Sequence, residues 1–192
     1  MFPTYSLDVK RFLLYVKINP DYDQVMQQDQ LDEIVAQWAR QRPAVDVSGM
    51  EIIGRIGRLN KVVRPQLDIV FARHDLESWE FDVLATLLRT GEPHRLTPGE
   101  LLDSMMITSG AMTNRIDRLE RRGFVERMKN PDDLRQVLVT LTPEGMRTVD
   151  AALVDHAENE KTIVSVLSAK QQEKLIKLLR TLEQGATSDT SK

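Results

Sequence analysis

The sequence predicts a mainly α-helical fold with one small β-hairpin. Apolar residues recur every three or four positions through most of the chain from Leu31 to Leu182, which is the spacing of amphipathic helices. One short stretch, residues 124–141, instead alternates apolar and polar residues as strands do. Aromatic residues make up 5% of the 192 residues and charged residues 29%, a balance typical of helices with long solvated faces. Because 41% of the residues are hydrophobic, the chain can bury a core, and we expect one folded unit.

The composition excludes several classes of site. The chain contains no cysteine, which removes disulfides, thiolate metal sites and thiol-based redox sensing. His74, His94 and His156 are dispersed without the spacing of a zinc site, so we expect neither a metal nor another cofactor. No run of residues approaches the roughly 20 apolar positions of a membrane helix, and the start of the chain lacks the pattern of a signal peptide. We therefore expect a cytoplasmic protein with no membrane partner.

The N-terminal part of the chain predicts an irregular extension followed by two helices. Residues 1–28 show little periodicity, so the folded domain is expected over residues 29–184. A short amphipathic helix is predicted from Leu31 and ends before Pro43. A longer helix of about 25 residues follows, and Ser48 with Glu51 forms a capping-box pattern at its start.

Three shorter helices are predicted next. The first runs from Ser78 to Arg89 and stops before a glycine. The second begins at Thr97-Pro98-Gly99-Glu100, which places a hydroxyl cap, a proline at the first helical position and a glutamate three residues after the cap. The third begins at Ser109 and ends at Gly123, with Met112, Ile116 and Leu119 on its apolar face.

A hairpin and two further helices complete the prediction. Residues 124–128 and 136–141 are expected to be strands, and the turn-forming residues 129–133 lie between them. Thr142-Pro143 and Ser168 with Gln171 then cap two more helices. Residues 185–192 are polar, and we expect them to form a disordered tail.

The order of these elements predicts a winged helix-turn-helix with long N- and C-terminal dimerisation helices and a DNA-binding core over residues 97–141. In such folds the second short helix enters the major groove and the hairpin reaches the backbone or the minor groove. The net charge of −3 argues against a DNA-binding protein, but residues 115–135 carry seven basic and five acidic side chains, a local excess of two positive charges. We expect DNA contacts from Ser109, Thr113, Asn114, Arg118, Arg121, Arg122, Lys129 and Arg135.

Three motifs in this core resemble the MarR family of transcription regulators. They are LTP at residues 96–98, TSGAMTNRIDRLERRG at residues 108–123 and DDLR at residues 132–135. In the last motif the arginine often follows the aspartate directly, whereas here Leu134 intervenes. The resemblance spans about residues 31–182 and implies a homodimer that binds double-stranded DNA at a palindromic operator, with one winged unit on each half-site.

Within that family, the chain is similar to the urate-responsive, PecS-like subgroup. The similarity lies in an additional N-terminal helix with a tryptophan and in the motif WEFDVL at residues 79–84. It implies a ligand site made by Trp38, Asp82, Arg115 and Arg127, found in the motifs QWAR, WEFDVL, TNR and VER.

Chemistry makes this set of residues plausible as a site for urate or a related aromatic anion. An indole can stack on a flat ligand, and a guanidinium donates paired hydrogen bonds to its oxygens. If Asp82 forms a salt bridge with Arg127, the incoming anion would repel the carboxylate and shift the elements that contact DNA. The leading hypothesis is therefore a repressor that a small anion releases from DNA.

Simpler explanations exist for each residue of the ligand set. Trp38 could be a packing anchor, Asp82 a carboxylate favoured by the helix dipole, Arg115 a phosphate contact and Arg127 an exposed strand residue. Two other functions stay open. One is a constitutive or architectural winged-helix protein that senses nothing. The other is an enzyme acting on a purine-like compound, which is disfavoured because no nucleophile with an adjacent base, metal cluster or phosphate loop is present.

Overall fold

A computed structural model describes residues 30–105, 109–131 and 133–188, so the predicted irregular extension lies outside the described residues. Contacts among the described residues divide the chain into two compact units, with the boundary between residues 62 and 63, and the expectation of one folded domain over residues 29–184 stays a prediction. The boundary lies inside helix α4 (Ser48–Arg73). The physical reason is the distribution of the core: among the described residues of the first unit, Leu31 and Val47 are the buried apolar side chains, whereas the second unit contains an extensive cluster.

The first unit joins α3 (Gln30–Gln41) to the start of α4, as predicted. The side chain of Leu31 lies over Gly54, where an added Cβ would come within 2.7 Å of a leucine methyl carbon. Asp32 forms an ion pair with Arg55 at 2.5 Å. The expected capping box at Ser48 is replaced, because the Ser48 N–H donates to the carboxylate of Asp46 at 2.9 Å.

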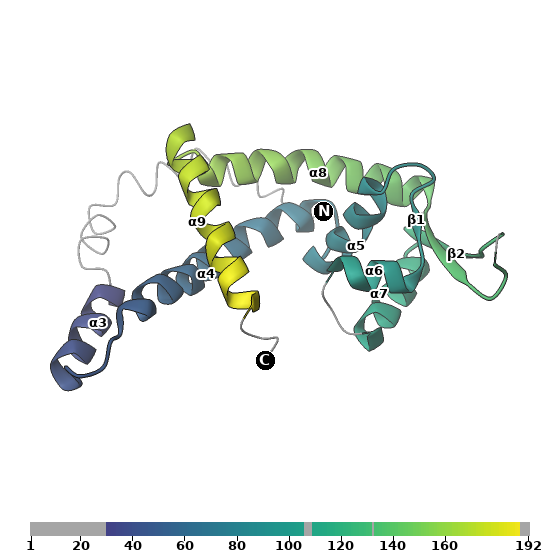
Figure 1. Cartoon of the computed structure of the whole chain (residues 1–192). Coiled ribbons are helices and arrows are strands. Elements are labelled where there is room, and N and C mark those ends of the chain that lie inside the picture. The colour runs from purple at the N-terminus through teal and green to yellow at the C-terminus, as the bar shows by residue number, and fades with distance from the viewer. Residues whose placement is uncertain (1–29, 106–108, 132, 189–192) are drawn as a thin grey trace. The chain divides into compact units, whose positions relative to one another are not determined.

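The second unit packs helices around a small sheet (Figure 1). Its elements are α5 (Ser78–Arg89), β1 (Arg95–Leu96), α6 (Pro98–Met105), α7 (Ser109–Arg121), β2 (Val125–Lys129), β3 (Val137–Leu141), α8 (Pro143–Val164) and α9 (Ala169–Ser188). Leu84, Leu101, Val139 and Val149 are fully buried and come from α5, α6, β3 and α8. The residues predicted to form the DNA-binding core therefore share one apolar cluster with the helices on either side of them.

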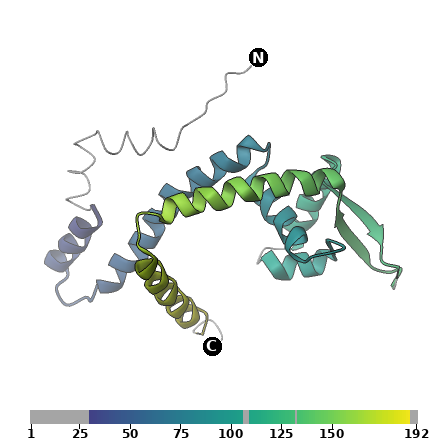
Figure 2. The same ribbon diagram turned by 90° about the horizontal axis from the view of Figure 1, so that it is seen from above.

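The sheet contains the predicted hairpin and one strand that the sequence did not reveal. Its order is β1-β3-β2, and both pairings are antiparallel. In the hairpin Val125 faces Leu141 and Lys129 faces Val137. β1 has only two residues, which is too short for alternation to be recognised, and it is fixed by pairing with β3. The hairpin of β2 and β3 extends beyond helices α6 and α7 (Figure 2).

Most helix ends follow the predicted capping signals. The Glu100 N–H donates to the Thr97 hydroxyl at 3.2 Å, and the Thr97 N–H donates to the Glu100 carboxylate at 2.7 Å. The Gly145 N–H donates to the Thr142 hydroxyl at 3.0 Å. Gly123 ends the turn after α7 with a φ of +73°, a conformation that favours glycine.

The C-terminal end of α9 corrects the prediction of a disordered tail from residue 185. The helix continues to Ser188, and the Thr187 hydroxyl donates to the backbone carbonyl of Glu183 at 3.0 Å. Gly185 is tolerated inside the helix because a single glycine costs only about 1 kcal/mol of helix stability. The polar composition of the residues after position 184 therefore did not indicate where α9 ends.

Gly145 provides a test of the packing between α8 and the sheet. An added Cβ would lie 2.0 Å from the carbonyl oxygen of Phe124, and this backbone atom cannot move aside easily. We expect Gly145→Ala to lower the free energy of unfolding by about 1–3 kcal/mol or more. Gly99→Ala is the matched control, because it also follows a Thr-Pro cap but its Cβ would be 3.9 Å from its nearest neighbour, the Thr97 hydroxyl. Equal urea midpoints for the two variants would contradict this packing.

Candidate nucleic-acid interface and ligand site

The orientation of α7 is set by its apolar side. Met112, Ile116 and Leu119 are 2%, 1% and 0% exposed and belong to the core. Thr113 and Asn114, between these positions in the sequence, are exposed on the other side of the helix. The structure thus presents a polar face of α7 to the surroundings, as the periodicity predicted.

The residues predicted to contact DNA are distributed over α7 and the hairpin. Ser109 is the first residue of α7. Lys129 ends β2, and Arg135 lies in the turn before β3, where its N–H donates to the Asp133 carboxylate at 3.0 Å. Exposed side chains belong to Thr113, Asn114, Arg118, Arg121, Lys129 and Arg135, whereas Arg122 is partly buried. Whether each of them touches DNA stays a prediction.

Arg118 is held by two residues at the start of α5. Its guanidinium carbon lies 4.6 Å from the centre of the Trp79 ring, and it also donates a hydrogen bond to the Glu77 carboxylate. The Trp79 indole N–H donates to the same carboxylate at 2.7 Å. The hydrogen bonds from Trp79 and Arg118 stabilise the ionised form and lower the pKa of Glu77 below its ordinary value. Arg118 is therefore exposed but already oriented.

Arg127 ties β2 to α7. One of its terminal nitrogens pairs with the Asp117 carboxylate at 2.5 Å, and the other pairs with Glu120. Burial alone would lower the pKa of Arg127, but the hydrogen bonds to the two carboxylates outweigh it and raise that pKa. The hairpin and the helix are thereby joined at the base of the hairpin.

Asp82 lies near positive charges but not in a salt bridge with Arg127. Among the described residues, none pairs with its carboxylate within 4 Å. Partial desolvation raises the pKa of Asp82 above its ordinary value, and the charges of Arg64 and Arg115 oppose this shift. Trp79 lies one turn before Asp82 on α5, and the Arg115 guanidinium is 5.5 Å from its ring centre. The structure therefore gathers Asp82 and Arg115, whereas Arg127 is engaged with other carboxylates.

Trp38 belongs to the first unit, on α3, and its side chain is 45% exposed. Its placement relative to Asp82, Arg115 and Arg127 stays a prediction.

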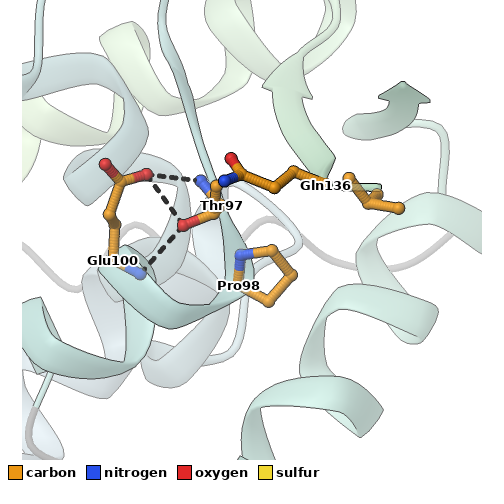
Figure 3. A pocket seen from close by; sticks show the side chains of 5 residues that line it. Thr97, Pro98, Glu100 and Gln136 are labelled. Carbon is orange, nitrogen blue, oxygen red and sulfur yellow. Dashed lines mark hydrogen bonds between the residues drawn. The ribbon is translucent and has the colours of Figure 1, made fainter. Parts of the chain in front are cut away.

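An open hollow lies between the start of α6 and the hairpin (Figure 3). It is lined by Thr97, Pro98, Glu100, Gln136 and Val137. The Glu100 carboxylate points to the Thr97 N–H and hydroxyl, and these two hydrogen bonds lower the pKa of Glu100. This carboxylate is therefore occupied in capping α6.

Comparison with known proteins gives the family. The MarR family model matches residues 76–137. The HTH-type transcriptional regulator PecS of Dickeya dadantii (strain 3937) is 37% identical over 154 residues, which cover 80% of this chain and 93% of the relative. The chain belongs to the MarR family. It is thus a DNA-binding transcription regulator of a family whose members are not enzymes.

Solved structures of MarR proteins share the fold. A mutant MarR from E. coli, complexed with operator DNA, is 28% identical and has a TM-score of 0.60, with 72% of this chain and 99% of that chain covered. A MarR family transcriptional regulator from Streptomyces coelicolor has a TM-score of 0.63 at 24% identity, covering 74% of this chain and 98% of that one. The predicted winged helix-turn-helix fold is confirmed.

The described part of this MarR chain contains neither a helix long and apolar enough to cross a bilayer nor a group of three or more metal-binding side chains.

Sequence reasoning missed the start of α5 as part of this site. Glu77 and Trp79 contact an arginine about 40 positions later, and no local spacing reveals such a pair. Arg64 was also missed; it donates to the Ser78 hydroxyl at 2.5 Å and acts electrostatically on Asp82. The motif at residues 79–84 was the one available sequence signal for this region, because it contains both Trp79 and Asp82.

The raised pKa of Asp82 predicts how its replacement changes stability with pH. The folded protein holds the Asp82 proton more tightly than the unfolded chain does, so the ionised carboxylate destabilises the fold above its raised pKa. We expect Asp82→Asn to raise the melting temperature near pH 7. The gain should shrink as the pH falls through the raised pKa and vanish below the ordinary pKa of an aspartate.

Differential scanning calorimetry across this pH range measures the effect. Asp103→Asn is the control, because Asp103 is an exposed aspartate on α6 outside this cluster. A variant Asp82→Asn that melts at or below the wild-type temperature at neutral pH would refute the argument.

Proposed function

We propose that this MarR-family regulator is a repressor that binds a palindromic operator as a homodimer and is released by a small aromatic anion such as urate. The observation that carries the DNA-binding part is the exposed polar face of α7 beside an exposed basic hairpin. Thr113 and Asn114 lie near the start of α7, where short polar side chains suit base edges and phosphates. Lys129 and Arg135 suit the DNA backbone or the minor groove.

The pairing of Arg127 with Asp117 and Glu120 supports simultaneous use of α7 and the hairpin. Two elements that are tethered at this point keep a defined angle, which a rigid duplex requires of a helix in the major groove and a wing beside it. The similar E. coli MarR is complexed with operator DNA, which favours the same use of the fold here.

The apolar faces of α4 and α9 support a homodimer. Ile52, Ile53, Ile56, Leu59, Leu175, Ile176, Leu178, Leu179 and Leu182 are between 39% and 60% exposed in the single chain. A concentration of large apolar side chains on helix surfaces marks an interaction surface, because their exposure to water is unfavourable. A second copy of the chain would cover them and present two winged units to a palindrome.

Leu179→Glu tests this assembly. A charge in an apolar interface loses its hydration, so we expect the variant to become monomeric and to bind operator DNA at least about tenfold more weakly. Size-exclusion chromatography with light scattering measures the mass, and circular dichroism checks that the helices are intact. Thr181→Glu, at an exposed polar position of the same helix, should stay dimeric. A dimeric Leu179→Glu protein would exclude α9 from the interface.

The cluster of Asp82, Arg115 and Arg64 supports a site for an anion. Arg115 and Arg64 both act electrostatically on Asp82, whose ionised form is disfavoured. Arg64 also pairs with Asp68 at 3.2 Å, whereas no carboxylate of the described residues pairs with Arg115, so Arg115 is available to an incoming negative charge. A flat aromatic anion would accept hydrogen bonds from Arg115 and stack on an indole, either Trp38 as the family resemblance implies or the neighbouring Trp79.

Arg115 links this site to DNA binding, because it is a residue of α7. An anion that draws the guanidinium away from Trp79 would shift the helix that is expected to enter the major groove. To weaken DNA binding by about 5- to 150-fold, the ligand must favour the non-binding arrangement by about 1–3 kcal/mol.

Urate binding to the free protein and its effect on DNA binding provide the test. We expect isothermal titration calorimetry to detect urate binding by the wild type, and Arg115→Ala to abolish it. Arg121→Ala is the matched control, because Arg121 is an exposed arginine on the same helix and should leave urate binding unchanged. In gel-shift titrations, urate should displace wild-type protein from its own promoter.

Three outcomes decide between the alternatives. Equal urate binding by wild type and Arg115→Ala would place the ligand elsewhere. Operator binding that no urate concentration changes would favour the constitutive DNA-binding protein. Trp38→Ala that binds urate like the wild type would remove Trp38 from the site.

A further inference from the structure

A second contact between α5 and α7 involves a fully buried carboxylate. Glu80, on the first turn of α5, is 0% exposed. One of its oxygens accepts hydrogen bonds from the Arg122 guanidinium at 2.6 Å and from the Glu77 backbone N–H at 2.9 Å. Its other oxygen is buried without a hydrogen-bond partner among the described residues. A carboxylate in this position depends on its cationic partner, because burial removes the water that would otherwise stabilise the charge.

Both terminal nitrogens of Arg122 are hydrogen-bonded within the protein. The terminal nitrogen that does not bind Glu80 donates to the Asp75 backbone carbonyl at 2.6 Å and to the Asp75 carboxylate at 2.7 Å. The guanidinium carbon also lies 4.7 Å from the centre of the Phe124 ring. Both terminal nitrogens and one face of the guanidinium are therefore occupied, and only 30% of the side chain is exposed.

Arg121 shows the contrasting arrangement one residue earlier. Its side chain is exposed, and in the described parts of the chain its only hydrogen-bond partner is the Asp117 carbonyl of the same helix at 3.3 Å. Two adjacent arginines of the same basic run thus differ in what is available to an external phosphate. Sequence reasoning had assigned both of them to DNA.

We propose that Glu80 is a positioning residue for DNA recognition and that Arg122 acts through it without contacting DNA. The buried pair anchors the C-terminal end of α7 to the first turn of α5, immediately before the Gly123 turn that leads into β2. The pair therefore fixes the orientation of α7 and the position at which β2 of the hairpin begins. This inference rests on the proposed entry of α7 into the major groove.

The anchor differs from the contact between Arg118 and Glu77. Glu77 and Arg118 are both more than 40% exposed, so a phosphate can compete with Glu77 for that arginine. A phosphate cannot compete with Glu80 in this way, because moving Arg122 to DNA would leave a buried carboxylate unpaired. Arg122 is consequently unsuited to leave Glu80 for a DNA phosphate each time the protein binds DNA.

A pair of substitutions separates anchoring from DNA contact. Arg122→Met leaves the Glu80 carboxylate unpaired, so we expect a lower melting temperature and weaker operator binding. Adding Glu80→Gln removes the buried charge and keeps an oxygen for the Glu77 N–H. The double variant should recover most of the melting temperature, because replacement of both partners of a buried pair is often tolerated. It should still bind operator DNA about tenfold more weakly than the wild type, because the end of α7 is no longer anchored to α5.

The salt dependence of operator binding distinguishes the loss of positioning from the loss of a phosphate contact. The plot of log K against log salt has a negative slope, and each lost phosphate contact reduces its magnitude by about 0.9. A homodimer loses two contacts per substitution, so the magnitude falls by about 1.8. We expect the double variant to keep the wild-type slope. Arg121→Met, the matched control, should lose about 1.8 while melting like the wild type.

Two results would overturn the proposal. One is a double variant that melts like the wild type but loses the same slope as Arg121→Met, because Arg122 would then contact DNA. The other is wild-type operator affinity in either Arg122→Met or the double variant, because the pair would then position nothing.

Arg122→Lys keeps the proposal testable if the double variant does not fold. A lysine retains a charge for a phosphate but cannot bridge Glu80 and Asp75 as the planar guanidinium does. We expect its operator affinity to fall about tenfold, and wild-type affinity would contradict anchoring. Because melting temperatures are measured without DNA, loss of the proposed DNA function and loss of the anchor are distinguished.

Discussion

The burial of one apolar stripe on α7 is the constraint on which the rest of the DNA-binding unit depends. Met112, Ile116 and Leu119 enter the core together, and each buried side chain of this size contributes about 1.5–3 kcal/mol. Rotating the helix to expose all three would sacrifice much of the 5–15 kcal/mol by which a domain is typically stable. The polar side of α7 is therefore held outward by the core and does not need DNA to orient it.

Electrostatic contacts with α5 then refine the position of α7. Arg115 and Arg118 of α7 lie over Trp79, and Arg122, which directly follows α7, reaches the buried Glu80. Three arginines therefore contact the first turn of α5. A protein with a net charge of −3 can bind DNA in this way, because acidic residues on the inner side order the basic ones and leave others exposed. The next turn of α5 carries Asp82, which places the proposed ligand site next to these contacts.

The division of the chain into two units has a corresponding explanation in burial. The first unit buries few apolar side chains among its described residues, and α4 and α9 each carry many exposed ones. In a single chain these apolar side chains stay exposed to water. In our proposal a second copy covers them, so that the same helices supply stability and set the spacing of the two DNA-binding units.

Local patterns in the sequence determined most elements and the polarity of α7. The Thr-Pro caps before α6 and α8, the stripe at Met112, Ile116 and Leu119, and the alternation in β2 and β3 each involve neighbours in the chain, so their physics is visible without a structure. The end of α9 and the two-residue β1 were not predicted, because a polar helix end and a short paired strand carry weak local signals.

The partners of the charged residues were decided only by the tertiary structure. The sequence analysis considered a salt bridge between Asp82 and Arg127, whereas folding brings Arg127 to Asp117 and Glu120. Folding also pairs Arg122, a predicted DNA contact, with Glu80. An ion pair depends on distance and burial after folding. Glu80 and Arg122 are 42 positions apart in the sequence, and no local spacing predicts a contact between them. Residue types therefore identified the basic region, and packing selected which of its arginines remain available for another molecule.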